Sequence, residues 1–314
     1  MTVSNESPDD PRNDDAPAVT AVAGGSLELG LADIANLRWA AVDVSAPLEE
    51  ARRRLDLSPI AAVALGRAMA AAALLLRFTT KNLGRVIVEV AGDGPLGRIV
   101  AEVDSAGRMR GLVGDPHVET PTSGELEIGW AVGSGVFRVI RDSPRGRYTS
   151  QVALENGEIG TDLAHFLEQS EQIRSAALVG VLPRPDGIAA AGGLVVEALP
   201  GTEAMVLGRL EANIAELPGV STALADGGVE ALRTAVMGSF SSEVTERLDL
   251  AYDCPCERGQ LLERLGTLSD DDVDDLVDAD GSFELECAYC ADRFTVHRDE
   301  LRSISTDDES MNVN

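Results

Sequence analysis

The sequence has few of the residues that nucleic-acid-binding proteins and hydrolytic enzymes rely on. Of its 314 residues, 26 are Lys or Arg and 53 are Asp or Glu, so the formal net charge is −27. Nucleic-acid binding depends on neutralising phosphates with basic side chains, and this charge balance argues against such a partner. Only three histidines occur, and no G-x-S-x-G, H-E-x-x-H or P-loop motif is found. We therefore expect neither an enzyme nor a nucleotide-driven machine.

The sequence also lacks any segment typical of an export signal or a membrane span. Residues 1–26 are acidic and polar, with no apolar stretch of the signal-peptide kind. The most apolar stretch, Ile60 to Phe78, is rich in alanine and is interrupted by Gly66, Arg67 and Arg77. A buried helix therefore fits it better than a membrane span. We expect a cytoplasmic protein in a reducing compartment, with no membrane partner. The strong acidity fits either a saline cytoplasm or a soluble, self-repelling chain.

Cysteine is scarce too, but its placement is informative. The four cysteines form two close pairs, Cys254-Pro-Cys256 and Cys287-Ala-Tyr-Cys290. Two short chelating loops brought together place four sulfurs around one centre, which is the ligand set of a closed tetrahedral zinc site. Four thiolates leave no open position for a bound water, which weakens any zinc-hydrolase interpretation. The sequence thus predicts one zinc ion per chain.

Two uses of such a site remain open from the spacing alone. The commoner use is an inert structural zinc ribbon on a protein-interaction module. The other is a redox switch, because the thiolates that bind the metal are also the atoms that an oxidant attacks. The apolar residues around the cysteines are few, so loss of zinc, which contributes on the order of 10 kcal/mol, should melt this segment. The acidic run Asp270–Asp280 either favours unfolding by repulsion or is a solvated helix face.

The pattern of turns and apolar residues predicts an α+β fold. Ser58-Pro59 should open a long helix that ends near Phe78. Short strands follow, separated by Gly and Pro turns, and Thr161 should cap a helix to about Gln172. The strands are expected at 86–90, 98–103, 109–113, 136–141 and 149–154, with a closing hairpin of 176–181 and 192–198. Tight turns between neighbouring strands indicate an antiparallel sheet, with helices on one side of it.

Beyond Pro200-Gly201 the pattern changes to short amphipathic helices. Apolar residues from Val206 to Leu217 recur at helical spacing, and a second helix is expected around Val229–Val236. Both helices must pack on something, either permanently or as conditionally docked elements. Ser269 should cap a helix with an acidic first turn. The predicted organisation is an acidic disordered tail (1–26), an α+β core (27–200), a helical linker (201–248), a zinc-binding segment (249–304) and a second disordered tail (305–314).

Several of these segments together resemble the 33-kDa heat-shock protein family. The most specific is the C-x-C pair in Asp253–Arg258 (DCPCER), followed at a distance by C-A-Y-C. Upstream segments similar to the family occur in the same order: RWAAVDVSAPL (38–48), AGDGPL (91–96), GRMRG (107–111), LEQSEQ (167–172) and AAAGGL (189–194). The resemblance covers most of residues 30–304.

The resemblance implies a redox-regulated, ATP-independent holdase chaperone of the cytoplasm. It implies that Cys254, Cys256, Cys287 and Cys290 bind one zinc ion in the reduced state. It further implies that oxidation forms Cys254–Cys256 and Cys287–Cys290 disulfides, releases the zinc and unfolds the zinc segment and then the linker. The uncovered apolar surface would bind unfolding or oxidatively damaged client proteins. Family resemblance also implies a monomer when reduced and a homodimer when oxidised.

Overall fold

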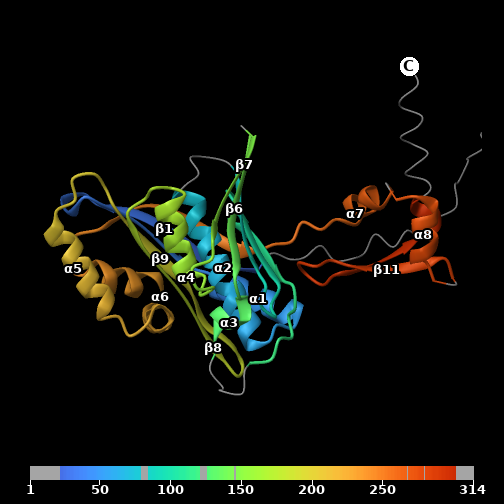
Figure 1. Ribbon diagram of the computed structural model, residues 1–314, viewed down its shortest axis with the longest axis horizontal. Coiled ribbons are helices and arrows are strands. Elements are labelled where there is room, and N and C mark those ends of the chain that lie inside the picture. Colours follow the sequence, from blue (N-terminus) through green and yellow to red (C-terminus); the bar gives the residue numbers. More distant parts are fainter. Residues whose placement is uncertain are drawn as a thin grey trace, which may run out of the picture. The chain divides into compact units, whose positions relative to one another are not determined.

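The computed structural model describes residues 22–78, 84–120, 126–144, 146–266, 268–278 and 280–301. The chain divides into two compact units. The larger comprises Ala21–Cys254 together with Ala288–Ala291, and the smaller includes Pro255–Cys287 and the chain from Asp292 onward. The predicted α+β class is confirmed (Figure 1). Of the predicted tails, residues 1–21 and 305–314 lie outside the described residues, whereas 22–26 already belong to the first strand.

A ten-stranded sheet forms the frame of the larger unit. Its order is β7-β6-β3-β4-β5-β10-β1-β2-β9-β8, and every neighbouring pair is antiparallel except β5 and β10. The strands are β1 (Val22–Ala32), β2 (Leu37–Asp43), β3 (Arg85–Gly92), β4 (Arg98–Asp104), β5 (Arg108–Val113), β6 (Gly135–Ser143), β7 (Gly146–Ala153), β8 (Ser175–Arg184), β9 (Gly187–Ala198) and β10 (Glu243–Tyr252). The five predicted strands and the β8–β9 hairpin are all present.

Strand β10 is one of the elements that the sequence analysis did not predict, and β1 and β2 are others. It spans the predicted boundary between linker and zinc segment, and it lies in the middle of the sheet between β1 and β5. It pairs with β1 along most of its length and with β5 at Ala251 and Tyr252. Tyr252, the last residue of β10, is fully buried. The chain therefore reaches Cys254 directly from the centre of the sheet.

One face of the sheet is covered by the helix predicted to begin at Pro59, and its bounds are confirmed as α2 (Pro59–Phe78). Alanine and leucine let this helix bury almost every side chain against β1, β2, β3, β4, β5, β8 and β9. Among the described residues it is the one helix long and apolar enough to cross a membrane, and 89% of its most apolar window is buried inside the protein. Shorter helices accompany it: η1 (Asp33–Ala35), α1 (Ser45–Leu55), α3 (Ile128–Val132) and α4 (Gly160–Gln169).

The expected cap of α4 is wrong. The helix begins at Gly160, so Thr161 lies inside its first turn, and it ends at Gln169 rather than near Gln172. The fully buried carboxylate of Asp162 takes the capping role instead. It accepts hydrogen bonds from the backbone N–H groups of Ile159 (2.8 Å), Glu155 (2.8 Å) and Asn156 (3.3 Å). A carboxylate can accept from several donors at once, which a hydroxyl does less well.

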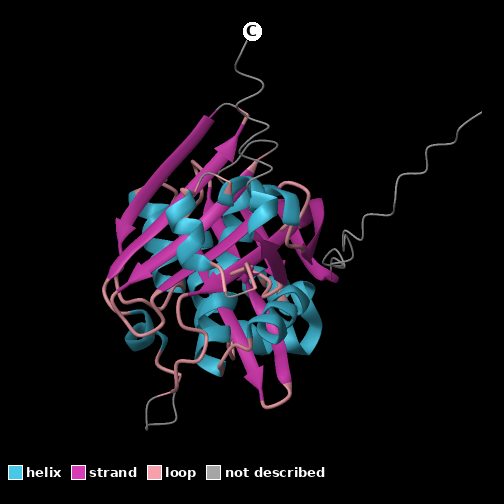
Figure 2. Ribbon diagram, turned by 90° about the vertical axis from the view of Figure 1, so that its right-hand side faces the viewer, coloured by secondary structure: helices cyan, strands magenta, loops and turns pink. Residues whose placement is uncertain are grey.

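The expectation of helices on one side of the sheet concerned residues 27–200, and the linker adds helices on the other side. The linker forms α5 (Ala204–Ala215) and α6 (Val220–Met237), and α6 packs on β2, β8 and β9. Alternate residues of a strand point to opposite faces. Trp39 and Ala41 belong to the cluster with α6, whereas the neighbouring buried Ala40 and Val42 point to the opposite face, the one that α2 covers. Figure 2 shows the helices, in cyan, lying against the strands of the sheet, in magenta.

The apolar cluster under α5 and α6 is substantial, and we call it the linker cluster. Its buried members come from the sheet and from the linker: Ala32, Ala35, Leu37, Trp39, Ala41, Ala190, Leu194, Val196, Leu210, Ala223, Leu224, Val229, Leu232, Val236 and Met237. The Arg233 guanidinium lies 5.4 Å from the centre of the Trp39 ring. A Cβ at Gly192 would clash with the Val42 carbonyl oxygen and would lie 2.9 Å from Leu224 Cδ1, so glycine in β9 lets both β2 and α6 approach closely. Helix α5 contributes one buried residue, Leu210, and is held more weakly than α6.

The smaller unit has little core of its own. It contains α7 (Arg258–Leu265), α8 (Asp270–Leu276) and the antiparallel hairpin of β11 (Ser282–Glu286) and β12 (Arg293–His297). Its buried cluster consists of Leu262, Val273, Phe283, Val296 and Leu301. The predicted Ser269 cap is confirmed, because its Oγ accepts the N–H of Asp272 at 3.2 Å. A cluster of five buried apolar side chains is small for an independently stable unit.

Packing at the linker cluster leads to the first prediction. Replacing the fully buried Leu232 with Ala should lower the free energy of unfolding by about 2–5 kcal/mol, because it removes buried methyl groups and leaves a cavity. Chemical denaturation followed by circular dichroism measures this loss. The control is Met205→Ala on α5, where the side chain is 77% exposed and the change should be small. Equal effects of the two substitutions would mean that α6 is not packed as described.

Candidate metal centre

The four cysteines lie at the ends of regular elements. Cys254 follows β10 by two residues, and the intervening Asp253 donates its N–H to the carbonyl of Met109 at 3.0 Å. Cys287 comes directly after β11, and its N–H donates to the carbonyl of Asp292 at 2.9 Å. Cys290 lies in the turn that joins β11 to β12. Strand pairing and turn hydrogen bonds therefore fix the backbone near each pair.

The structure brings all four predicted ligands together. Their sulfur atoms lie within 4.8 Å of one another. Cys254, Cys287 and Cys290 are buried, and Cys256 is half-buried. Zn–S bonds of about 2.3 Å in a tetrahedron place sulfurs roughly 3.8 Å apart, so a small contraction of this cluster suits such an ion. Four soft thiolate donors at these distances could hold a metal ion of the zinc type.

An arginine that the sequence analysis did not single out lies against this cluster. Arg110 Nη1 donates to Cys254 Sγ at 3.4 Å, and its Nε donates to the carboxylate of Glu102. The same guanidinium lies 4.1 Å from the centre of the Tyr289 ring. Burial by itself would lower the pKa of Arg110, but the Cys254 sulfur and the Glu102 carboxylate hold that pKa above its ordinary value. Arg110 therefore carries its positive charge at the cluster.

Tyr289, between Cys287 and Cys290, is held by a second contact. Tyr252 Oη donates to the Tyr289 carbonyl oxygen at 2.6 Å. Burial, with help from the Glu102 carboxylate, raises the pKa of the Tyr289 phenol above its ordinary value.

Arg110 lies within the GRMRG segment of the sequence. An arginine on a strand whose neighbours are apolar was the signal that could have drawn attention to it.

The histidines of the sequence do not join the cluster. Among the described residues, the group able to hold a metal consists of the four cysteines alone. His297 lies at the end of β12, where its backbone N–H donates to Glu300 at 2.8 Å. His165 lies on α4, and its Nδ1 is 3.9 Å from a Glu155 carboxylate oxygen.

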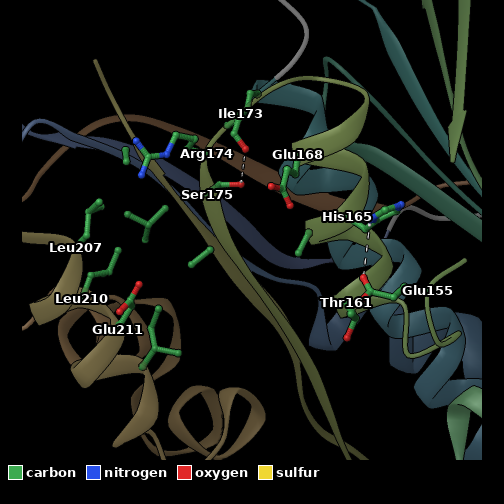
Figure 3. Close-up of a pocket in the computed structure, with 15 residues that line it drawn as sticks. Glu155, Thr161, His165, Glu168, Ile173, Arg174, Ser175, Leu207, Leu210 and Glu211 are labelled. Carbon is green, nitrogen blue, oxygen red and sulfur yellow. Dashed lines mark hydrogen bonds and ion pairs between the residues drawn. The ribbon is translucent and has the colours of Figure 1, made fainter. Parts of the chain in front are cut away.

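His165 lines a separate cleft of about 380 Å³ between α4, the β8 and β9 ends and α5 (Figure 3). Val196, Leu207, Leu210 and Ile214 supply apolar lining. The Ser175 hydroxyl in this cleft donates to the Ile173 carbonyl at 3.5 Å, while His165 pairs with Glu155 (Figure 3). The two side chains thus interact with different groups, Ser175 with a backbone carbonyl and His165 with a carboxylate. The cleft marks where α5 covers the sheet incompletely.

Comparison with known proteins connects this geometry to a family. The family model described as "Hsp33 protein" matches residues 27–297. The "33 kDa chaperonin" of Thermus thermophilus is 40% identical over 294 residues, covering 89% of this chain and 86% of that protein. The protein of the same name from Deinococcus radiodurans is 36% identical, covering 88% and 96%. The crystal structure of the 33 kDa chaperonin from Thermotoga maritima superposes with a TM-score of 0.83 at 32% identity, covering 91% of this chain and 99% of that one.

The donor set leads to the second prediction. Elemental analysis of the reduced protein should give one zinc ion per chain, and replacing all four cysteines with serine should abolish binding, because hydroxyls do not replace thiolates as zinc ligands. His297→Ala is the matched control and should retain the metal. Zinc retained by the four-serine variant would show that another site binds it.

Proposed function

The chain belongs to the Hsp33 family of chaperones, and we propose that it is a redox-regulated, ATP-independent holdase. In this proposal Cys254, Cys256, Cys287 and Cys290 hold one zinc ion when reduced. The observation that carries the proposal is the convergence of four mostly buried sulfurs within 4.8 Å, next in sequence to a unit with only a small apolar core. The bound ion supplies the bonding that this small core lacks.

Oxidation would act on the cysteines in their sequence pairs. Disulfides Cys254–Cys256 and Cys287–Cys290 use the four sulfurs and leave no thiolate to hold a metal. The small buried apolar cluster of the smaller unit then has to stabilise it alone, and several carboxylates of α8 repel one another. The C-x-C ring is small and strained, so it should be readily reduced, which suits a reversible switch.

The linker cluster supplies the surface that such a switch would uncover. Helices α5 and α6 hide apolar side chains of β2 and β9, among them Leu37, Trp39 and Leu194. Helix α5 has one buried residue and a cleft beside it, so it should open before α6. Exposed apolar patches of this kind bind other apolar segments. Unfolding or oxidatively damaged proteins expose such segments, and we propose them as clients.

The remaining parts of the proposal concern where the protein acts and with which partners. We propose a cytoplasmic protein that is a monomer when reduced and a homodimer when oxidised, with no nucleic-acid or membrane partner. The strong negative charge, −27 in all, supports solubility and opposes binding to anionic surfaces. No catalytic role is proposed.

The third prediction is that holdase activity appears only after oxidation and needs no nucleotide. Light scattering of a heat-denaturing client, measured with reduced and peroxide-treated protein, tests it. The oxidised protein should suppress aggregation and the reduced protein should not, whereas a Cys-to-Ser variant, which cannot hold zinc, should give the same result with and without oxidant. Equal protection by the reduced protein would favour the alternative of an interaction module with an inert zinc ribbon.

The fourth prediction concerns which segments open. Chelation under oxidising conditions should expose residues 199–242 and 255–301 to protease, since both rely on small or conditionally covered apolar clusters. Strand β10 should stay protected because it pairs on both sides within the sheet. Mass spectrometry of the fragments gives the cleavage sites. Cleavage within β10 at the same rate as in the linker would contradict this separation.

A further inference from the structure

Arg110 contacts both cysteine loops at once. Its guanidinium donates to Cys254 Sγ and lies over the Tyr289 ring, in the turn that carries Cys290. We propose that Arg110 is a positioning residue that holds these loops on β5 and slows oxidation of Cys254. This inference rests on the proposed redox function. It assigns control of how readily Cys254 is oxidised to the Arg110 side chain.

The contacts form one continuous set. Arg110, Glu102, Tyr252, Cys254 and Tyr289 all belong to the larger unit. Glu102 on β4 accepts from Arg110 on the neighbouring β5, and their side chains are 9% and 17% exposed. Tyr252 fixes the Tyr289 backbone while Arg110 fixes its ring. A partly desolvated cation over an aromatic ring and a charge-assisted hydrogen bond are both stronger than their exposed counterparts.

The neighbouring charges show why Arg110 rather than another cation has this role. Glu102 also lies 3.8 Å from Arg85, so its carboxylate is shared by two guanidinium groups. Arg108, two residues earlier on β5, pairs with Asp104 at 2.6 Å. Arg110 is thus the cation of β5 that donates to a cysteine sulfur, and Arg108 provides a matched control residue with a carboxylate partner.

Oxidation would remove one of the partners of Arg110. A Cys254 thiolate attacks a peroxide oxygen, the O–O bond breaks, and a sulfenic acid and hydroxide form. The Cys256 thiolate then displaces a second hydroxide from that sulfur, so the S–S bond forms and two electrons pass to the peroxide. The disulfide sulfur is neutral and a poor acceptor. Arg110 then keeps the Glu102 carboxylate but loses the Cys254 thiolate as a partner, which loosens the Tyr289 turn.

The same contact sets the sign of the effect on rate. When metal is bound, the thiols are already deprotonated, so a nearby cation cannot raise the thiolate fraction further. It lowers the energy of the thiolate and weakens it as a nucleophile. The guanidinium also covers a sulfur that is already buried, Cys254 being 4% exposed. Removing Arg110 should therefore speed the attack on peroxide.

The test compares reduced, zinc-loaded, full-length wild type with Arg110→Gln, Arg110→Lys and the control Arg108→Gln. Zinc release after limiting peroxide is followed with a metallochromic dye, and the pairs are resolved by alkylation and mass spectrometry. Arg110→Gln should release zinc about tenfold faster, the effect of losing one charge-assisted hydrogen bond. The rate of formation of the Cys254–Cys256 disulfide should increase more than that of the Cys287–Cys290 disulfide. Arg110→Lys keeps the charge and should lie between Gln and wild type, and Arg108→Gln should match wild type.

Equal oxidation rates in wild type, Arg110→Gln and Arg108→Gln would overturn the inference. If Arg110→Gln fails to fold or to hold zinc before oxidant is added, Arg110→Lys decides: a rate equal to wild type overturns the inference, and a faster one supports it. Failure of the proposed function would be distinguishable, because wild type itself would then keep its zinc in excess peroxide, while alkylation still compares the cysteine reaction rates among the variants.

Discussion

The meeting of four cysteine sulfurs is the constraint on which the behaviour of this chain depends. Two of them follow β10 and two flank the turn of the β11–β12 hairpin. Among the described residues of the smaller unit, the buried apolar cluster has only five members, so it stabilises the unit less. Most small units of this kind rely on a metal or on disulfides to stay folded. Here the same four sulfur atoms can bind a metal ion or form disulfides, and the two states place the sulfurs in different arrangements.

The large sheet has the opposite character. Helix α2 buries almost all of its side chains against seven strands, so this face does not depend on the cysteines. The other face, over β2 and β9, is covered by the two linker helices. Helix α6 is packed more firmly than α5, because α6 has six buried residues and α5 has one. Stability is therefore graded within the larger unit. Graded stability is what allows one part of a protein to open while the rest keeps its fold.

Much of this could be read from the sequence, and the failures have physical causes. Pro59 and the alanine-rich run gave α2 its bounds, and the cysteine spacing identified the cluster. Strand β10 escaped because few of its side chains are buried before Leu250, so backbone pairing with β1 and β5 holds it. The period-two apolar pattern is confined to Leu248, Leu250 and Tyr252 at the end of the strand. Asp162 escaped because its three N–H donors lie upstream of α4 in a turn whose shape is tertiary. Arg110 escaped because only the fold brings β5 beside Cys254.

The position of β10 has a consequence for reversibility. The linker runs from Ala198, at the end of β9, to Glu243, at the start of β10, and both strands stay in the sheet. Glu243 pairs with Leu31, Leu31 pairs with Arg38, and Arg38 pairs with Glu197, next to Ala198. The two ends of the linker therefore lie at the same end of their strands, three strand spacings or about 14 Å apart. A melted linker would thus be a loop with both ends pinned rather than a free tail. Closing such a loop again has a small entropic cost, so the sheet acts as a template that retains the linker for refolding.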